Sequence, residues 1–225
     1  MRHEVQPVAT PSIVQYAYAR SGAYSAGSSQ TVTATLAKPA ALGNQLFLIA
    51  TASTYSGVNA GITPPAGSVA VPGAYGNYGG AEGSWAWRLP VNRAGMTVIS
   101  LTQAQSLVNL AVIEVSRGAA LTAASSNLGT YTTSTASCPA VSRAGAFARF
   151  GMIQTDGNGT TPTGMTPATV SPLHLFTGSS SFGGNTESGH NGYLFSVPAA
   201  LTGQSNMQTA ANNTTGCVEV ALYAH

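Results

Sequence analysis

Charged side chains are scarce in this sequence. Only 6% of the 225 residues are Asp, Glu, Lys or Arg, and the formal net charge is +2, whereas an average soluble domain is roughly 25% charged. Helices usually keep their exposed faces wet with Lys and Glu, so this scarcity, together with 26 Gly and 12 Pro, argues against a helical protein. Isolated arginines also cannot form the basic stripe that nucleic-acid binding requires. We therefore expect a β protein that binds no nucleic acid.

The sequence also lacks a long apolar run. No stretch of about 20 apolar residues is present, so we expect no membrane-spanning helix and no membrane partner. Residues 1–7 place no apolar segment behind Arg2, so we expect a soluble protein made in the cytoplasm without a signal peptide. Net charge keeps many monomers apart, so a surface this neutral is expected to be covered by neighbouring subunits, including further copies in a homo-oligomer.

Cysteine is rare, and the common catalytic motifs are missing. Cys138 and Cys217 both lie in strand-like segments, and since a buried thiol often serves as a small hydrophobic residue, free cysteines are favoured over a disulfide. No CxxC pair and no Cys/His spacing typical of zinc occurs. The nucleophile elbow of hydrolases, the His-Glu-x-x-His helix and the Gly-rich phosphate loop are also missing. The sequence predicts no catalytic residues, no metal, no cofactor and no enzymatic activity.

Two polar segments have some features of metal sites. Asp156–Gly159 begins like a calcium loop, but the glycine and the carboxylate that such a loop needs further on are missing, so a hairpin turn is the better interpretation. Glu187 and His190 lie three residues apart and could combine with His174 and Asp156. The glycines around them do not hold ligands at fixed separations, so a polar loop is favoured.

Two glutamates lie in apolar strands at similar places in the chain. Glu114 and Glu219 could form the carboxylate pair of a glycoside hydrolase. The simpler interpretation is that strand alternation points each one to solvent or to an arginine such as Arg117 or Arg149, and this interpretation is favoured.

Period-2 patterns predict most of the strands. Residues 31–36 alternate like a half-buried strand, and residues 45–50 form a continuous apolar run that predicts a central strand of a sandwich. Residues 96–101 and 110–115 are further strand candidates. Trp85-x-Trp87 places two indoles on one face of a strand, where core packing is favoured over exposure.

An internal repeat is visible beneath this pattern. The spacing aromatic-x-aromatic-x-x-Pro-x-x-x-x-Gly starts at Trp85 and again at Tyr193, and each half ends on an apolar strand with one glutamate. Each half alone has a thin core, so we expect a single β-sandwich over residues 21–225, built from pseudo-repeated halves at about 21–122 and 123–225. The alternative is two side-by-side sandwiches. Residues 1–20 are expected to form an N-terminal arm or a first strand.

Five motifs occur in order in the first half: a Gly-Asn turn before an apolar strand at 43–48, Thr-Pro-Pro-x-Gly at 63–67, aromatic-x-aromatic at 85–87, an Ala-Gly-x-Thr hairpin at 94–102 and a strand that ends in a small-residue turn at 114–118. In this order they resemble a set of bacteriophage and phage-derived β-sandwich proteins. The resemblance implies an all-β, jelly-roll-like antiparallel sandwich in a virion component, such as a capsid decoration, head fibre or minor tail protein. It implies a place in the virion after synthesis in the host cytoplasm, and major capsid or tail subunits as partners.

Two parts of the chain are candidates for such contacts. The N-terminal arm, with Val8, Pro11 and Ile13, is a candidate for capsid attachment. Residues 72–84 are rich in Gly and Tyr and should form a long loop, in which Tyr75 and Tyr78 could stack on sugar rings. The leading hypothesis is a non-enzymatic structural protein that attaches to a virion by protein–protein contacts. The alternative is a carbohydrate-binding module that adheres to host surface glycans.

Overall fold

The computed structural model describes residues 10–21, 29–54, 61–73, 76–78, 82–104, 106–117, 119–127, 135–138, 145–155, 162–176, 179–182, 185–188, 192–198, 205–209 and 214–224. These residues form nineteen strands and no helix, and every strand pair between them is antiparallel. This confirms the prediction of an all-β sandwich. Within the same residues, no helix has the length and apolar character needed to cross a membrane.

The first half of the chain forms two sheets. Sheet A has the order β1 (Ile13–Arg20), β9 (Ser106–Val115), β3 (Gln45–Thr54), β7 (Glu82–Pro90) and β5 (Val69–Ala70), and β6 (Gly76–Tyr78) also pairs with β7. Sheet B has the order β2 (Ser29–Thr35), β8 (Val98–Ala104) and β4 (Ile62–Thr63). The segment 72–84, expected to be one long loop, therefore contains β6 and the start of β7.

The second half forms two further sheets and a hairpin. Sheet C has the order β10 (Ala119–Asn127), β19 (Thr214–Ala224), β12 (Ala146–Thr155), β17 (Gly192–Val197) and β14 (Ser171–Phe176). Sheet D has the order β11 (Thr135–Cys138), β18 (Ser205–Thr209) and β13 (Pro162–Thr166). Strands β15 (Ser179–Phe182) and β16 (Asn185–Ser188) pair only with each other.

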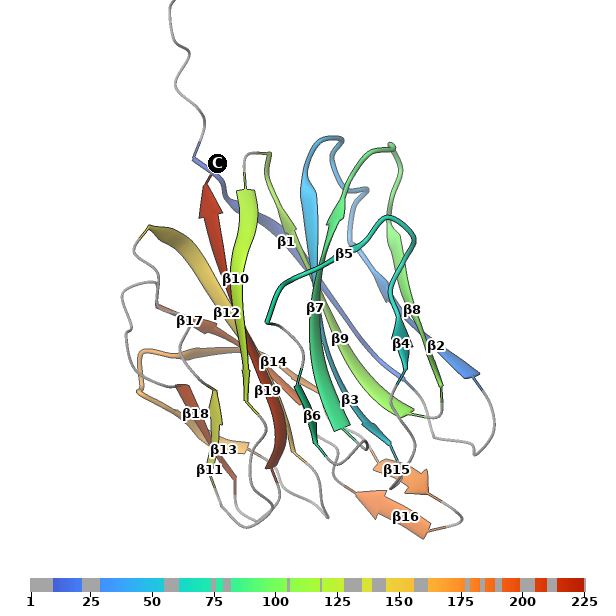
Figure 1. Cartoon of the computed structure of the whole chain (residues 1–225), viewed down its shortest axis with the longest axis vertical. Helices are drawn as coiled ribbons and strands as arrows, with labels where there is room; N and C mark the ends of the chain where they lie inside the picture. The colour runs from blue at the N-terminus through green and yellow to red at the C-terminus, as the bar shows by residue number, and fades with distance from the viewer. Residues whose placement is uncertain are drawn as a thin grey trace, which may run out of the picture.

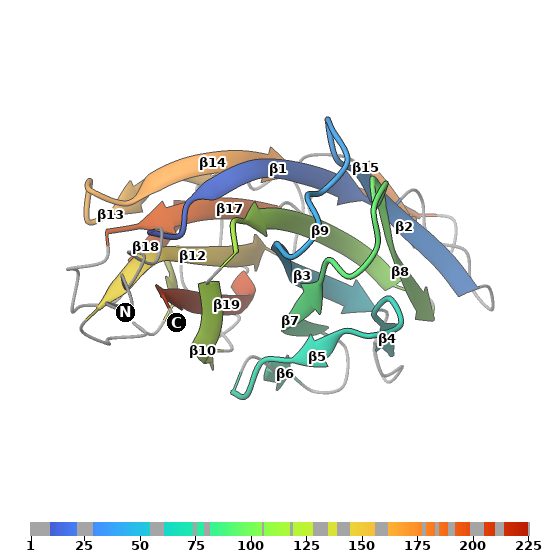
Figure 2. The same cartoon turned by 90° about the horizontal axis from the view of Figure 1, so that it is seen from above.

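The four large sheets stack in the order B, A, C, D, because three hydrophobic clusters lie between them. One cluster joins sheets A and B, a second joins A and C, and a third joins C and D. The first and second halves accordingly lie side by side in Figures 1 and 2, with sheets A and C in the middle.

Strand β3 shows why the central sheets have no polar face. Leu46 and Leu48 pack toward sheet B, whereas Phe47 and Ile49 pack toward sheet C, and all four are at most 1% exposed. A strand buried on both faces needs a continuous apolar run, which is what residues 45–50 provide. The prediction of a central strand at 45–50 is confirmed.

The strand order confirms the internal pseudo-repeat. Sheet A and sheet C use their strands in equivalent order, and so do sheets B and D. Trp85 and Tyr193, where the repeated spacing begins, lie on the equivalent strands β7 and β17. Within the described residues no sheet mixes strands of the two halves, so each half contributes whole sheets, and the shared layer is the packing of sheet A on sheet C.

The two cysteines correct one expectation. Cys138 of β11 and Cys217 of β19 form a disulfide, with Cα atoms 5.4 Å apart, instead of remaining free. This Cα separation lies within the range that a disulfide can bridge. Both residues are buried between sheets C and D, and sequence spacing could not show that the topology brings them together.

Candidate functional site

Three charged side chains singled out from the sequence, Glu114, Arg149 and Glu219, are buried in the protein. Arg149 and Glu219 are 1% and 0% exposed and form an ion pair. The Arg149 Nε–H donates to Glu219 Oε1 at 2.9 Å, and Nη1 donates to the carbonyl of Pro198 at 3.1 Å. The expectation that Glu219 meets Arg149 is confirmed, and the pair joins β12 to β19 inside the protein.

Glu114 is also fully buried, but its partners are neutral. The Glu114 carboxylate accepts hydrogen bonds from Gln15 Nε2 at 2.5 Å, from the Ala41 backbone N–H at 2.9 Å and from Asn44 Nδ2 at 2.6 Å. Asn44 Oδ1 in turn accepts from the backbone N–H of Arg117. Strand alternation suggested that Glu114 faces solvent or the Arg117 guanidinium, and the structure shows neither. The Glu114 carboxylate instead holds the turn before β3 against β1 and β9.

The two glutamates do not share a cleft. Glu114 follows Leu110 and Val112 on the face of sheet A that packs on sheet B. Glu219 lies between Val218 and Val220, which pack toward sheet A, so strand alternation points Glu219 the other way, toward sheet D. The carboxylate pair of a glycoside hydrolase is therefore not formed by these residues.

The other titratable candidates are not brought together in the described part of the chain. His174 lies on β14 and stacks on Tyr18 of β1, with ring centroids 4.1 Å apart. Asp156 and His190 lie outside the described residues, and of Glu187 only the backbone, in β16, is described. Among the residues that the structure describes, no group of three or more His, Cys, Asp or Glu could hold a metal ion.

The clearest candidate for a functional surface is apolar. Four large hydrophobic side chains of the described residues are exposed: Val14 at 41%, Leu42 at 59%, Val69 at 49% and Val98 at 56%. All four lie near one end of the first half, which we call the apolar end. In Figure 1 it is the upper end, where β3 and β8 begin and where β7 and β9 finish.

Strand register and two loops bring these residues to the same end. Ile13 at the start of β1 pairs with Val115, and Gln45 at the start of β3 pairs with both Val115 and Pro90. The loop 36–44 is joined to the loop 91–97 by backbone hydrogen bonds, including Ala40 N to Met96 O at 2.8 Å. Side chains from distant parts of the sequence therefore lie at one end of the first half.

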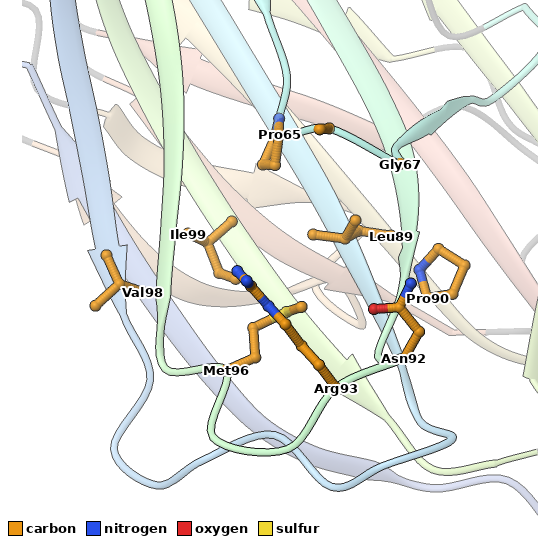
Figure 3. A pocket seen from close by; sticks show the side chains of 10 residues that line it. Pro65, Gly67, Leu89, Pro90, Asn92, Arg93, Met96, Val98 and Ile99 are labelled. Carbon is orange, nitrogen blue, oxygen red and sulfur yellow. The ribbon is translucent and has the colours of Figure 1, made fainter.

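A groove opens at the apolar end, with a volume of about 330 Å³. Buried apolar side chains line it from below (Leu89, Met96 and Ile99). Figure 3 shows Arg93 reaching from its loop into the groove between Ile99 and Leu89, with Pro65 on the opposite side. The exposed Val98 also lines the groove.

The groove has the chemistry of a contact surface. Among the described residues that line it, Arg93 is the one charged side chain, Asn92 adds an amide, and none carries a carboxyl or imidazole group. An exposed apolar patch around a hollow typically marks a site of protein interaction in a soluble protein. The arrangement can therefore bury an apolar segment of a partner and donate hydrogen bonds to it from Arg93 and Asn92.

The structure describes only some of the residues that the sequence proposed for contacts. Pro11 is buried, and Ile13 begins β1 and packs on the core between sheets A and C, so residues 13–20 are a first strand. Val8 and Tyr75 lie outside the described residues. Tyr78 ends β6, opposite Glu82, and its side chain is not described. Glycan binding through Tyr75 and Tyr78 stays a prediction from sequence.

Sequence reasoning missed the apolar end. Leu42 lies inside a polar turn segment, directly before Gly43-Asn44, and Val98 begins a strand on the side opposite to buried Ile99. The one signal in the sequence for an exposed apolar surface was Leu42, a large apolar residue in a turn. The position of Leu42 and Val98 at the same end depends on strand register, which the sequence pattern does not specify.

The fold and the surface define a two-half antiparallel β-sandwich with an apolar end. Comparison with protein-family models, with curated proteins and with solved structures found no match to this chain.

Proposed function

We propose that this chain is a non-enzymatic structural protein of a phage particle, which attaches to other virion subunits by protein–protein contacts at its apolar end. The assignment to a phage particle is based on the sequence motifs of the first half. The contact mode comes from one structural observation. The four exposed large apolar side chains of the described residues lie near the apolar end, where a groove opens whose described lining includes Val98 and one charged residue, Arg93.

The distribution of charge supports the same proposal. Two of the six acidic residues, Glu114 and Glu219, and one of the eight basic residues, Arg149, are fully buried and hydrogen-bonded inside the protein. The surface is therefore even less charged than the composition suggests. Apolar and hydrogen-bonding contacts remain as the means of attachment, either to capsid or tail subunits or to further copies of this chain.

A binding experiment with two variants on one strand tests the proposal. Val98→Asp places a charge at the apolar end, whereas Thr102→Asp places the same charge on exposed sheet B of the same strand, β8. In co-sedimentation with capsids or tails, Val98→Asp should weaken binding by about tenfold or more because a charge must be desolvated at the contact. Thr102→Asp should bind like the unmodified protein.

The salt dependence of the same binding gives a second readout. Few charges are available at the surface, so the affinity should change less than about threefold between roughly 50 and 500 mM salt. A collapse of binding within that range, or equal effects of Val98→Asp and Thr102→Asp, would contradict attachment through the apolar end.

A further inference from the structure

A row of buried polar side chains crosses sheet A at the end opposite to the apolar end. Arg20 of β1 pairs with Asn109 of β9, Asn109 pairs with Thr51 of β3, and Thr51 pairs with Ser84 of β7. Thr51, Ser84 and Asn109 are at most 2% exposed. Strand alternation points all four side chains toward sheet C, where Asn109 Nδ2 donates to Gln154 Oε1 at 3.3 Å.

Several polar atoms of this row have no partner among the described residues. Ser84 Oγ, Asn109 Oδ1 and both terminal nitrogens of Arg20 are buried and make no hydrogen bond. Leaving a buried polar group unpaired is costly, and the cost is largest for a charged group such as the guanidinium. The burial also lowers the pKa of Arg20 below its usual value, because the charged form is desolvated. Such a group needs an acceptor that the described chain does not supply.

A cavity of about 350 Å³ lies directly beside Arg20. It is lined by Arg20 and by the rings of Tyr18, His174 and Phe176, along with Ala19 and Leu175. The cavity lies between β1 and β14, which run next to each other along one edge in Figure 2. The His174 ring stacks on Tyr18 and meets Phe176 edge-on at 4.6 Å, so the walls are aromatic and held in place.

The charged groups that line the cavity determine which kind of ligand can bind there. Among the described residues that line it there is no carboxylate and no second Lys or Arg. Burial lowers the pKa of His174 below its usual 6.5, so its imidazole is neutral at neutral pH. A single guanidinium matches one negative charge, whereas a phosphate dianion would leave one charge unpaired in a partly buried place.

We propose that this cavity binds a small organic carboxylate that has a flat apolar or aromatic body. The carboxylate accepts two parallel hydrogen bonds from the Arg20 guanidinium, and the body lies against the rings of Tyr18, His174 and Phe176. Because Arg20 itself lines the cavity, rotation about its own side-chain torsions brings its N–H groups to the ligand. The proposal is independent of attachment through the apolar end, which lies at the other end of sheet A.

Calorimetric titration with benzoate tests the proposal on the full chain, with benzamide as its uncharged counterpart and phenyl phosphate as a dianion. Benzoate should bind saturably and at least about tenfold more tightly than either of the other two compounds. Arg20→Gln should reduce benzoate affinity by about tenfold or more, since a bidentate charged hydrogen bond is lost. Arg117→Gln removes an exposed arginine that lines neither the cavity nor the groove and should leave the affinity unchanged.

A second measurement separates binding from folding. If Arg20 is an unpaired buried cation, Arg20→Gln should melt at the same temperature as the unmodified protein or higher, and benzoate should raise the melting temperature only where Arg20 is present. The proposal is overturned if benzoate shows no saturable binding, if Arg20→Gln binds it equally well, or if phenyl phosphate binds more tightly. Phosphate preference would assign the cavity to phosphorylated ligands instead.

Discussion

Glu114, Arg149 and Glu219 show what single residues contribute to this protein. Each is fully buried, and each has hydrogen-bonding partners from parts of the chain that are distant in sequence. Charged groups in a low-dielectric interior are tolerated only when they are paired in this way. The residues that looked most like catalysts in the sequence therefore join strands and loops inside the protein through buried hydrogen bonds.

The Arg149–Glu219 pair allows a residue-scale prediction. Arg149→Met leaves the Glu219 carboxylate buried without its cation, and breaking such a pair from one side costs about 3–5 kcal/mol of stability. The double variant Arg149→Met with Glu219→Leu removes both charges and should recover most of that loss. Urea unfolding measures both effects. If Arg149→Met were as stable as the unmodified protein, the Arg149–Glu219 pair would not stabilise the contact between β12 and β19.

Strand β12 shows a constraint at the scale of an element. Gly151 lies opposite Phe195 of β17, and a Cβ added at Gly151 would collide with the Phe195 ring. Phe195 is fully buried between sheets C and D, so its ring has little room to move. The glycine therefore leaves the space that a large aromatic side chain on the neighbouring strand fills.

Gly151→Ala tests this constraint. The added methyl group must displace the Phe195 ring, and we expect a loss of about 1–3 kcal/mol of stability in chemical unfolding. Gly164→Ala in β13 is the matched control, because a Cβ there has no atom within 4 Å and should change the stability little. If the two variants were equally stable, Phe195 would not restrict β12.

The elements also show how far sequence reasoning reached. The apolar run 45–50 and the pattern of 110–115 predicted strands correctly, because burial on one or both faces is written in the spacing of apolar residues. The Cys138–Cys217 bond and the row from Arg20 to Ser84 were not predictable, because they depend on which strands become neighbours and in which register. The local pattern of apolar residues specifies that a segment is a strand. Which other strand it pairs with depends on the whole chain.

The whole molecule is held together by its middle layer. Phe47, Ile49 and Ile113 of sheet A meet Phe150 and Met152 of sheet C in one hydrophobic cluster, and all are at most 2% exposed. Neither half could keep this surface out of water alone. The halves repeat one plan, yet they share the core that a sandwich needs.

This shared layer predicts that the halves unfold together. Both tryptophans, Trp85 and Trp87, lie in the first half, whereas the disulfide lies in the second. Replacing Cys138 and Cys217 by Ala should lower the stability of the second half by about 2–4 kcal/mol. In a cooperative molecule, the tryptophan fluorescence midpoint should fall with it. An unchanged tryptophan midpoint, or two separate calorimetric peaks, would show that the halves unfold independently.

The stacking order B, A, C, D has one more consequence. Sheets B and D each pack against a sheet of their own half, and the seam between the halves is closed by A and C alone. Peptide epitopes grafted onto a loop at the edge of sheet B or sheet D would then perturb one flank and leave the seam intact. The protein thus offers two separate positions for peptide display, and different peptides could be inserted at each of them in a single chain.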